Sequence, residues 1–144
     1  MFFLIRKVAG SELRVAIADL SHQLHRSTHP PLAPKIDAIR IAAKVDTGAA
    51  VCLFSHEDGL QLGLPVAQGI PIVLSSLGGP LEAFGHEVIL QTGALAFHSL
   101  VYFAKYPGLP RNILGRQGWL RNLRLAVIDY DNLLYLSAYD AQET

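Results

Sequence analysis

Short stretches of alternating apolar and polar residues dominate this chain, and turn-forming residues (Gly, Pro, Asn and Asp) separate many of them. Alternation with a period of two is typical of strands that bury one face. The stretches that predict strands are residues 13–20, 36–45, 70–74, 81–90, 95–104, 125–130 and 133–139. The pattern therefore predicts an all-β fold.

Helical signals are few. Residues 55–62 predict one short helix, because Ser55 can cap its start and Asp58 stands three residues later, close to a capping-box arrangement. A second short helix is predicted over residues 116–123, with Trp119 in the core. The expected fold thus contains one or two short helices beside its strands.

Two adjacent glycines mark the turn of a predicted hairpin. Residues 77–80 (Leu-Gly-Gly-Pro) lie between the predicted strands 70–74 and 81–90. Gly78 and Gly79 both accept the positive φ angles that tight hairpin turns often require. We therefore predict that the two strands pair through a turn at these glycines.

The composition predicts one globular domain over residues 1–144. The chain is 51% hydrophobic and 17% charged, which is enough apolar material for a single core. Its formal net charge is +0, and it has neither a basic stripe that would bind nucleic acid nor a cationic amphipathic helix that would bind a membrane surface. No apolar run approaches the length of a membrane span.

The single cysteine, Cys52, excludes an internal disulfide and fits a reducing compartment. Its apolar neighbours predict a packed thiol and not a nucleophile. The apolar residues 1–5 are followed at once by Arg6 and Lys7, so they do not form a signal peptide. We expect a cytoplasmic protein.

The candidate chemistry lies in the run Asp46-Thr47-Gly48, which follows the predicted strand 36–45. An aspartate at the mouth of a tight turn is suited to activating water. Hydrolysis of an amide needs a base for the water and an acid for the leaving nitrogen, and two carboxylates that share one proton supply both. One copy of the chain offers one such aspartate, so two-fold symmetry would have to bring the second.

A second run, Asn112-Ile113-Leu114-Gly115-Arg116, is expected to pack behind this turn. Together with Asp46-Thr47-Gly48-Ala49 and the glycine hairpin, it resembles the retropepsin family of homodimeric aspartic peptidases, over roughly residues 36–130. The resemblance implies a closed barrel (the acid-protease fold), a homodimer, an endopeptidase activity on extended peptides, and no metal or organic cofactor.

The resemblance also implies roles for residues of the catalytic turn. Asp46 would supply one of the two catalytic carboxylates. The Thr47 hydroxyl would reach the partner's turn across the dimer axis, and the Gly48 carbonyl would meet substrate backbone. Ala49 would line the cleft.

Other residues would bind the substrate by the same resemblance. Leu77, Gly78 and Gly79 would form the tip of a flap that closes over the peptide, and Leu74 would add apolar cover. Ile113 would line a side-chain subsite beside Arg111.

The chain departs from the family pattern at two positions. Ala50 stands where viral relatives have an aspartate that pairs with the arginine after the later glycine, so Arg116 needs another partner. Lys44 lies two residues before Asp46, where the family usually has an apolar residue, and we expect it to point away from the cleft.

Less specific interpretations compete with catalysis. Asp46 could simply satisfy its own turn by hydrogen bonds. The chain could be a retropepsin-like module that binds peptides or dimerises without turnover, or a structural dimerisation domain. His22, His25 and His29 have spacings that a metal could use, but their proline-bounded segment favours a solvated loop.

Overall fold

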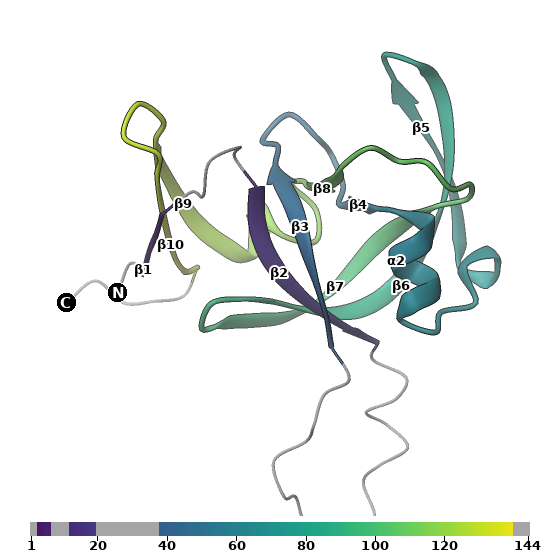
Figure 1. Cartoon of the computed structure of the whole chain (residues 1–144), viewed down its shortest axis with the longest axis horizontal. Helices are drawn as coiled ribbons and strands as arrows, with labels where there is room; N and C mark the ends of the chain where they lie inside the picture. Colours follow the sequence, from purple (N-terminus) through teal and green to yellow (C-terminus); the bar gives the residue numbers. More distant parts are fainter. Residues whose placement is uncertain (1–2, 7–11, 20–37, 140–144) are drawn as a thin grey trace, which may run out of the picture.

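Two sheets make up the computed structural model, which describes residues 3–6, 12–19 and 38–139 (Figure 1). The larger sheet contains β2 (Glu12–Asp19), β3 (Ile39–Val45), β4 (Leu53–Phe54), β5 (Ile70–Ser76), β6 (Gly79–Thr92), β7 (Leu95–Ala104) and β8 (Asn112–Leu114). The smaller sheet contains β1 (Phe3–Arg6), β9 (Leu123–Ile128) and β10 (Leu133–Ala138).

The larger sheet closes on itself. Its strand order is β2-β3-β8-β4-β7-β6-β5, and β2 also pairs with β6, so six strands form a closed barrel and β5 lies outside the ring. The closing pair is antiparallel and aligns Ala16 with Gln91 and Asp19 with Val88. The prediction of an all-β closed barrel is confirmed.

The barrel encloses the core because its strands alternate as the sequence predicts. In β3, Ile41 and Ala43 are buried while Arg40 is exposed. The long β6 and β7 pair over ten positions and contribute buried residues from each strand, among them Val88 and Phe103. All seven predicted strands are present, although their ends shift by a few residues.

The first predicted helix is confirmed as α2 (His56–Gln61). The Ser55 side chain caps it by accepting a hydrogen bond from the Asp58 backbone N–H at 3.1 Å. Gly63 follows the helix with a φ of 77°, a conformation that glycine adopts without strain. A single turn of 3₁₀ helix, η1 (Val66–Gln68), leads into β5.

The second predicted helix, over residues 116–123, is wrong. The chain forms turns there and only a short 3₁₀ helix, η2 (Leu120–Asn122). The backbone N–H groups of Arg116 and Gln117 donate to the carbonyls of Ala49 and Ala50, each at 2.9 Å. Gly118 has a φ of 98°, outside the right-handed helical region, so a helix cannot run through this segment. Trp119 is fully buried, as predicted.

The smaller sheet shares the core of the barrel. β10 lies between β1 and β9, antiparallel to both. Its residues Leu134 and Leu136 belong to the same cluster of buried apolar side chains as Val15 and Trp119 of the rest of the molecule. The sheet is therefore packed on the barrel through a continuous apolar contact.

Two further predictions concern the proline-rich segment and membrane-spanning helices. The proline-rich segment 22–34 with its three histidines lies outside them. Within residues 3–6, 12–19 and 38–139, no helix has the length and apolar character needed to cross a membrane.

Trp119 offers a test of the buried polar contacts. Its indole N–H donates to Thr92 Oγ1 at 3.2 Å, and both residues are buried. Thr92→Val should lower the free energy of unfolding by about 1–3 kcal/mol, because the indole N–H would lose its partner in the core. Urea titration followed by the fluorescence of this single tryptophan measures the change. Thr92→Ser keeps the hydroxyl and should recover most of it; equal losses in both variants would contradict this assignment.

Candidate active site

The turn after β3 holds Asp46 in a defined position. The Gly48 N–H donates to Asp46 Oδ1 at 2.9 Å, and the Ala49 N–H donates to the Asp46 carbonyl at 3.2 Å. Among the residues that the structure describes, no other group bonds to this carboxylate. The residue is half-buried; its Oδ1 is held by the turn, and its Oδ2 has no hydrogen-bond partner among the described residues.

Thr47 and Gly48 form the exposed part of this turn, and Ala49 is half-buried beside them. A Cβ atom on Gly48 would lie 3.3 Å from Asp46 Oδ1, a tight contact that glycine avoids. The turn thus presents the Asp46 and Thr47 side chains at one end of the barrel. The Gly48 bond also fits the simpler interpretation, in which the aspartate satisfies its own turn.

Strand β8 supports the turn from behind. β3 and β8 are parallel, with Val45 opposite Leu114, and the Asp46 N–H donates to the Leu114 carbonyl at 3.0 Å. The Arg116 N–H donates to the Ala49 carbonyl at 2.9 Å, so the turn is held at both ends. The prediction that residues 112–116 pack behind the turn at Asp46 is confirmed.

Gly115 makes this close approach possible. A Cβ atom at this position would lie 2.1 Å from the Val51 carbonyl oxygen and 2.9 Å from the Ala49 carbonyl oxygen. Both neighbours are backbone atoms, which cannot rotate away as a side chain could. Only glycine fits here, because any other residue would push the two segments apart.

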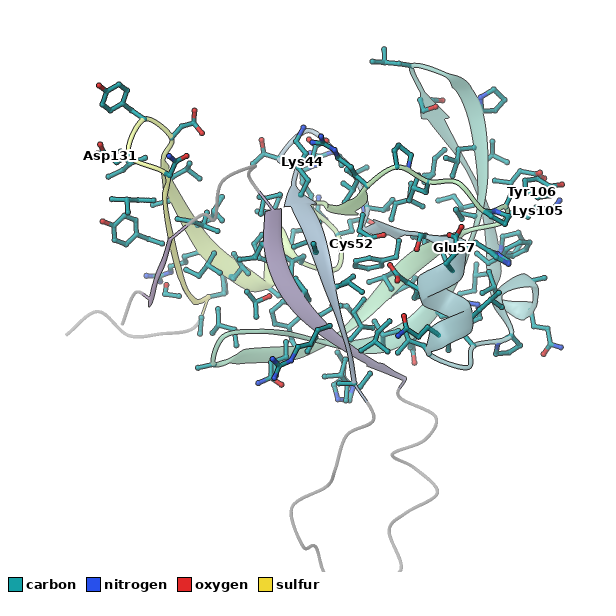
Figure 2. All side chains as sticks on the ribbon, in the orientation of Figure 1. Lys44, Cys52, Glu57, Lys105, Tyr106 and Asp131 are labelled. Atoms are coloured by element: carbon teal, nitrogen blue, oxygen red, sulfur yellow. The ribbon has the colours of Figure 1, made fainter. Side chains whose placement is uncertain are left out.

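Cys52 fills the space beneath the same contact (Figure 2). Its thiol is 0% exposed; it accepts a hydrogen bond from the Gly115 N–H at 3.4 Å and donates to the Gln117 carbonyl at 3.5 Å. Burial raises the pKa of Cys52 from 9.0 to about 11, and the Gly115 backbone bond lowers it by a smaller amount. The prediction of a packed thiol is confirmed.

Asn112 is a positioning residue that the sequence analysis missed. Its Oδ1 accepts from the Ser55 N–H at 2.9 Å, and its Nδ2 donates to the Ala42 carbonyl at 3.1 Å and to Asp58 Oδ2 at 2.9 Å. One side chain therefore joins β3, β8 and the start of α2. Asp58, which follows the helix cap by three residues, is half-buried in this network. A polar residue directly before the apolar pair of β8 was the available signal.

The predicted flap is the hairpin of β5 and β6, which stands clear of the barrel in Figure 1. Leu77 and Gly78 form its tip between the paired residues Ser76 and Gly79, and Leu77 is fully exposed. The Ser76 hydroxyl donates to the Gly79 carbonyl at 2.6 Å. The hairpin is confirmed, and Gly79 at its turn adopts a positive φ, of 106°.

Leu74 pairs with Leu81 across the hairpin and is half-buried. Between the hairpin and the segment 104–110 lies an open groove of about 380 Å³, lined by Leu81, Tyr106, Leu109 and others. An ion pair of 3.2 Å joins Lys105 to Glu82 near it, and this hydrogen bond raises the pKa of Lys105. The groove runs from the flap toward Pro110 and so ends close to β8.

The remaining predicted site residues surround β8. Ile113 is half-buried and is aligned with Lys44 in β3, two residues before Asp46. Arg111 is exposed and directly precedes the strand. The structure thus brings the turn 46–49 and Ile113 together. The flap tip stands apart from them, although both lie toward the upper edge of the view in Figure 1.

Two solved structures resemble this chain. A retropepsin-like aspartic protease from Rickettsia conorii superposes with a TM-score of 0.64 at 17% identity, covering 94% of this chain and 98% of that one. The EIAV protease, in complex with the inhibitor HBY-793, superposes with a TM-score of 0.50 at 17% identity, covering 78% and 83%. No family model and no curated protein matches the chain. The likenesses show that the chain has the retropepsin-like aspartic protease fold.

The close packing at Gly115 predicts a large effect of one methyl group. Gly115→Ala should lower the free energy of unfolding by more than about 4 kcal/mol, because the added carbon meets two backbone carbonyls. Gly78→Ala is the matched control, since its nearest neighbour would be Ser76 Oγ at 3.9 Å. Urea unfolding of both variants measures the difference. Similar stabilities would contradict the required close approach.

Burial of Cys52 predicts slow chemical labelling of its thiol and a specific pH dependence of protein stability. An aromatic disulfide reagent at pH 8 should label it only as fast as the protein opens, and at once in denaturant.

The folded pKa of Cys52, about 11, exceeds the unfolded value of 9.0, so its stabilising contribution is complete below pH 9 and is lost as pH rises toward 11. The full effect corresponds to roughly 3 kcal/mol. The difference in unfolding free energy between wild type and Cys52→Ala across this range measures it; a flat difference would contradict it.

Proposed function

We propose that this chain, with its retropepsin-like fold, is an aspartic endopeptidase that acts as a homodimer. Asp46 of each copy would hold one water molecule between them and activate it to attack the scissile carbonyl of an extended peptide. One observation carries the proposal: Asp46 Oδ1 accepts from the Gly48 N–H, Oδ2 has no hydrogen-bond partner among the described residues, and β8 holds the turn in place.

The chemistry requires two carboxylates with different protonation. Two such groups a few Å apart cannot both ionise cheaply, so they share one proton and titrate as a pair. The ionised group then accepts a proton from water, and the protonated one assists the leaving nitrogen. A symmetric dimer supplies the pair, because a two-fold axis brings the same residue of each copy to one place. The Thr47 hydroxyl, exposed beside Asp46, would bond the partner's turn.

The arrangement of projecting parts supports a partner on one side of the molecule. The turn 46–50, the flap tip and the turn between β9 and β10 all point toward the upper edge of Figure 1. The β9–β10 hairpin carries exposed apolar residues there: Val127 is 45% exposed, Ile128 44% and Tyr130 96%. A second copy that covers these residues would also face Asp46.

The substrate would be an extended peptide held beneath the flap. Leu77, Gly78 and Gly79 at the exposed tip would close over it, and Leu74 would add apolar cover. Gly48 would offer its carbonyl to the peptide backbone, and Ala49 would line the cleft. Arg111 and Ile113 would border a side-chain subsite where the groove reaches β8. Strand-like pairing between the cleft and the peptide gives affinity through backbone hydrogen bonds and specificity through pockets for alternate side chains.

The wider setting is also part of the proposal. Residues 1–144 would form one domain with its core at about 36–130, an arrangement supported by the apolar cluster shared between barrel and smaller sheet. The single free cysteine is consistent with a cytoplasmic location. Carboxylate chemistry of this kind requires no metal or organic cofactor.

A peptide-binding module without turnover is the second candidate. The open groove beside the flap favours it, because such a groove could hold a peptide whether or not Asp46 is paired. In that case the Gly48–Asp46 bond would serve only the turn.

Asp46→Asn separates the two functions. The variant should lose cleavage of a mixed peptide library by at least about a hundredfold, the lower end of what general acid–base catalysis contributes. Dimerisation, measured by sedimentation, should persist, because the amide keeps the shape of the turn. Glu87→Gln is the control, since Glu87 is an exposed carboxylate on β6. A wild-type protein that binds peptides but cleaves none at any pH, with or without a statine inhibitor, would support the binding module.

A further inference from the structure

Lys44 lies on the outer face of β3. Along this strand Ile41 and Ala43 are buried in the barrel, while Arg40 is exposed, so the alternation directs even-numbered residues outward. Lys44 is half-buried, although it is a lysine on the outer face. Its aliphatic stem therefore packs against neighbouring residues at this end of the strand.

The same alternation brings Lys44 and Asp46 to one face. The Asp46 N–H bonds the Leu114 carbonyl, which continues the parallel ladder one residue beyond β3. Residues two apart in an extended chain share a face and lie about 7 Å from each other. Figure 2 shows Lys44 at the end of β3 that leads into the turn. This register favours the opposite of the expectation that Lys44 points away from the cleft.

On the side of β8, the neighbours of Lys44 on this face are apolar or cationic. Ile113 is its partner in β8, about 4.8 Å away between strands, and Leu53 of β4 is the next partner in the row. Both are half-buried. Arg111, exposed just before β8, adds a second positive charge. Beside Asp46 the outer face therefore offers a short apolar floor bordered by two cations.

No described carboxylate neutralises these cations. Neither Lys44 nor Arg111 makes an ion pair with any residue whose side chain the structure describes. Asp58, in the first turn of α2, accepts a hydrogen bond from Asn112 of β8 at 2.9 Å. Glu12 of β2 is the backbone partner of Lys44 on the side away from β8. A half-buried lysine with no ion-pair partner among the side chains that the structure describes favours an anionic ligand.

We propose that Lys44, with Arg111 beside it, makes the subsite next to Asp46 selective for an acidic side chain, so that the preferred peptides carry Asp or Glu adjacent to the scissile bond. This inference rests on the proposed function, because it assigns a substrate class to the same cleft. Lys44 is a specificity-determining residue here and takes no part in the proton transfers.

The expected preference follows from the strength of a charge-assisted hydrogen bond. Such a bond contributes enough to change kcat/KM by about tenfold, since a factor of ten corresponds to 1.4 kcal/mol. Peptides with Glu should be cleaved about tenfold better than the same peptides with Gln, which has nearly the same shape. The preference should shrink with added salt and below about pH 4, where the free glutamate side chain becomes neutral.

The test compares matched peptide pairs, Glu against Gln and Asp against Asn, at each position flanking the cleaved bond. Lys44→Met should bring the Glu/Gln ratio of kcat/KM close to one, and Lys44→Glu should reverse the preference toward Lys-containing peptides. Arg40→Met is the matched control, because Arg40 lies on the same face of β3 but four residues, or about 13 Å, further from the turn. Thermal unfolding of each variant confirms that it is folded.

The outcomes separate this inference from the proposed function. Cleavage with a Glu/Gln ratio near one in wild type, or with a ratio unchanged by Lys44→Met and Lys44→Glu, would overturn the acidic preference and leave the peptidase standing. If the wild type cleaves nothing, fluorescence anisotropy with labelled Glu and Gln peptides tests whether Lys44 still gives a preference for Glu in binding. Tighter binding of the Glu peptide that depends on Lys44 would support the acidic preference in a module without turnover. Equal binding of both peptides, or no binding, would overturn it. A Glu preference that is absent in the wild type and appears only in Glu12→Gln would instead indicate that Lys44 belongs to a strand-to-strand ion pair, which overturns the proposal.

Discussion

The close contact between the turn 46–52 and the segment 112–117 is the constraint on which the rest of the site depends. Backbone hydrogen bonds from Asp46 to Leu114 and from Arg116 to Ala49 bind the two segments. Gly115 lets their backbones approach, and the Cys52 thiol fills the space beneath. Because both segments continue into barrel strands, the carboxylate of Asp46 is fixed relative to the whole barrel.

The candidate site therefore combines a firmly held turn at Asp46 with an exposed hairpin tip. The Asp46 turn is bonded on both sides, whereas the flap tip at Leu77 and Gly78 is exposed and bonded only within its own hairpin. This division suits hydrolysis of a bound chain, which needs a carboxylate in a fixed place and a cover that admits the peptide. Asn112 adds to the firm part by joining β3, β8 and the start of α2 through one side chain.

Sequence patterns predicted the long strands well and the short ones poorly. Alternation over seven or more residues located β3, β6 and β7, and the Ser55 cap located α2. β4 and β8 have two and three residues, which is too short for a period of two to be visible. The helix predicted over residues 116–123 failed because Gly118 adopts a φ of 98°, which a right-handed helix does not allow.

The sequence by itself determined the strands, the cap of α2, and the presence of one aspartate in a tight turn before small apolar residues. These features depend on side chains within a few positions of one another. Only the tertiary structure decided that β2 closes the barrel against β6, that Asn112 joins β3, β8 and the start of α2, and that Lys44 is aligned with Ile113 of β8. The physical reason is that ladder register and backbone approach arise between segments distant in the chain, and no local pattern encodes which of them will meet.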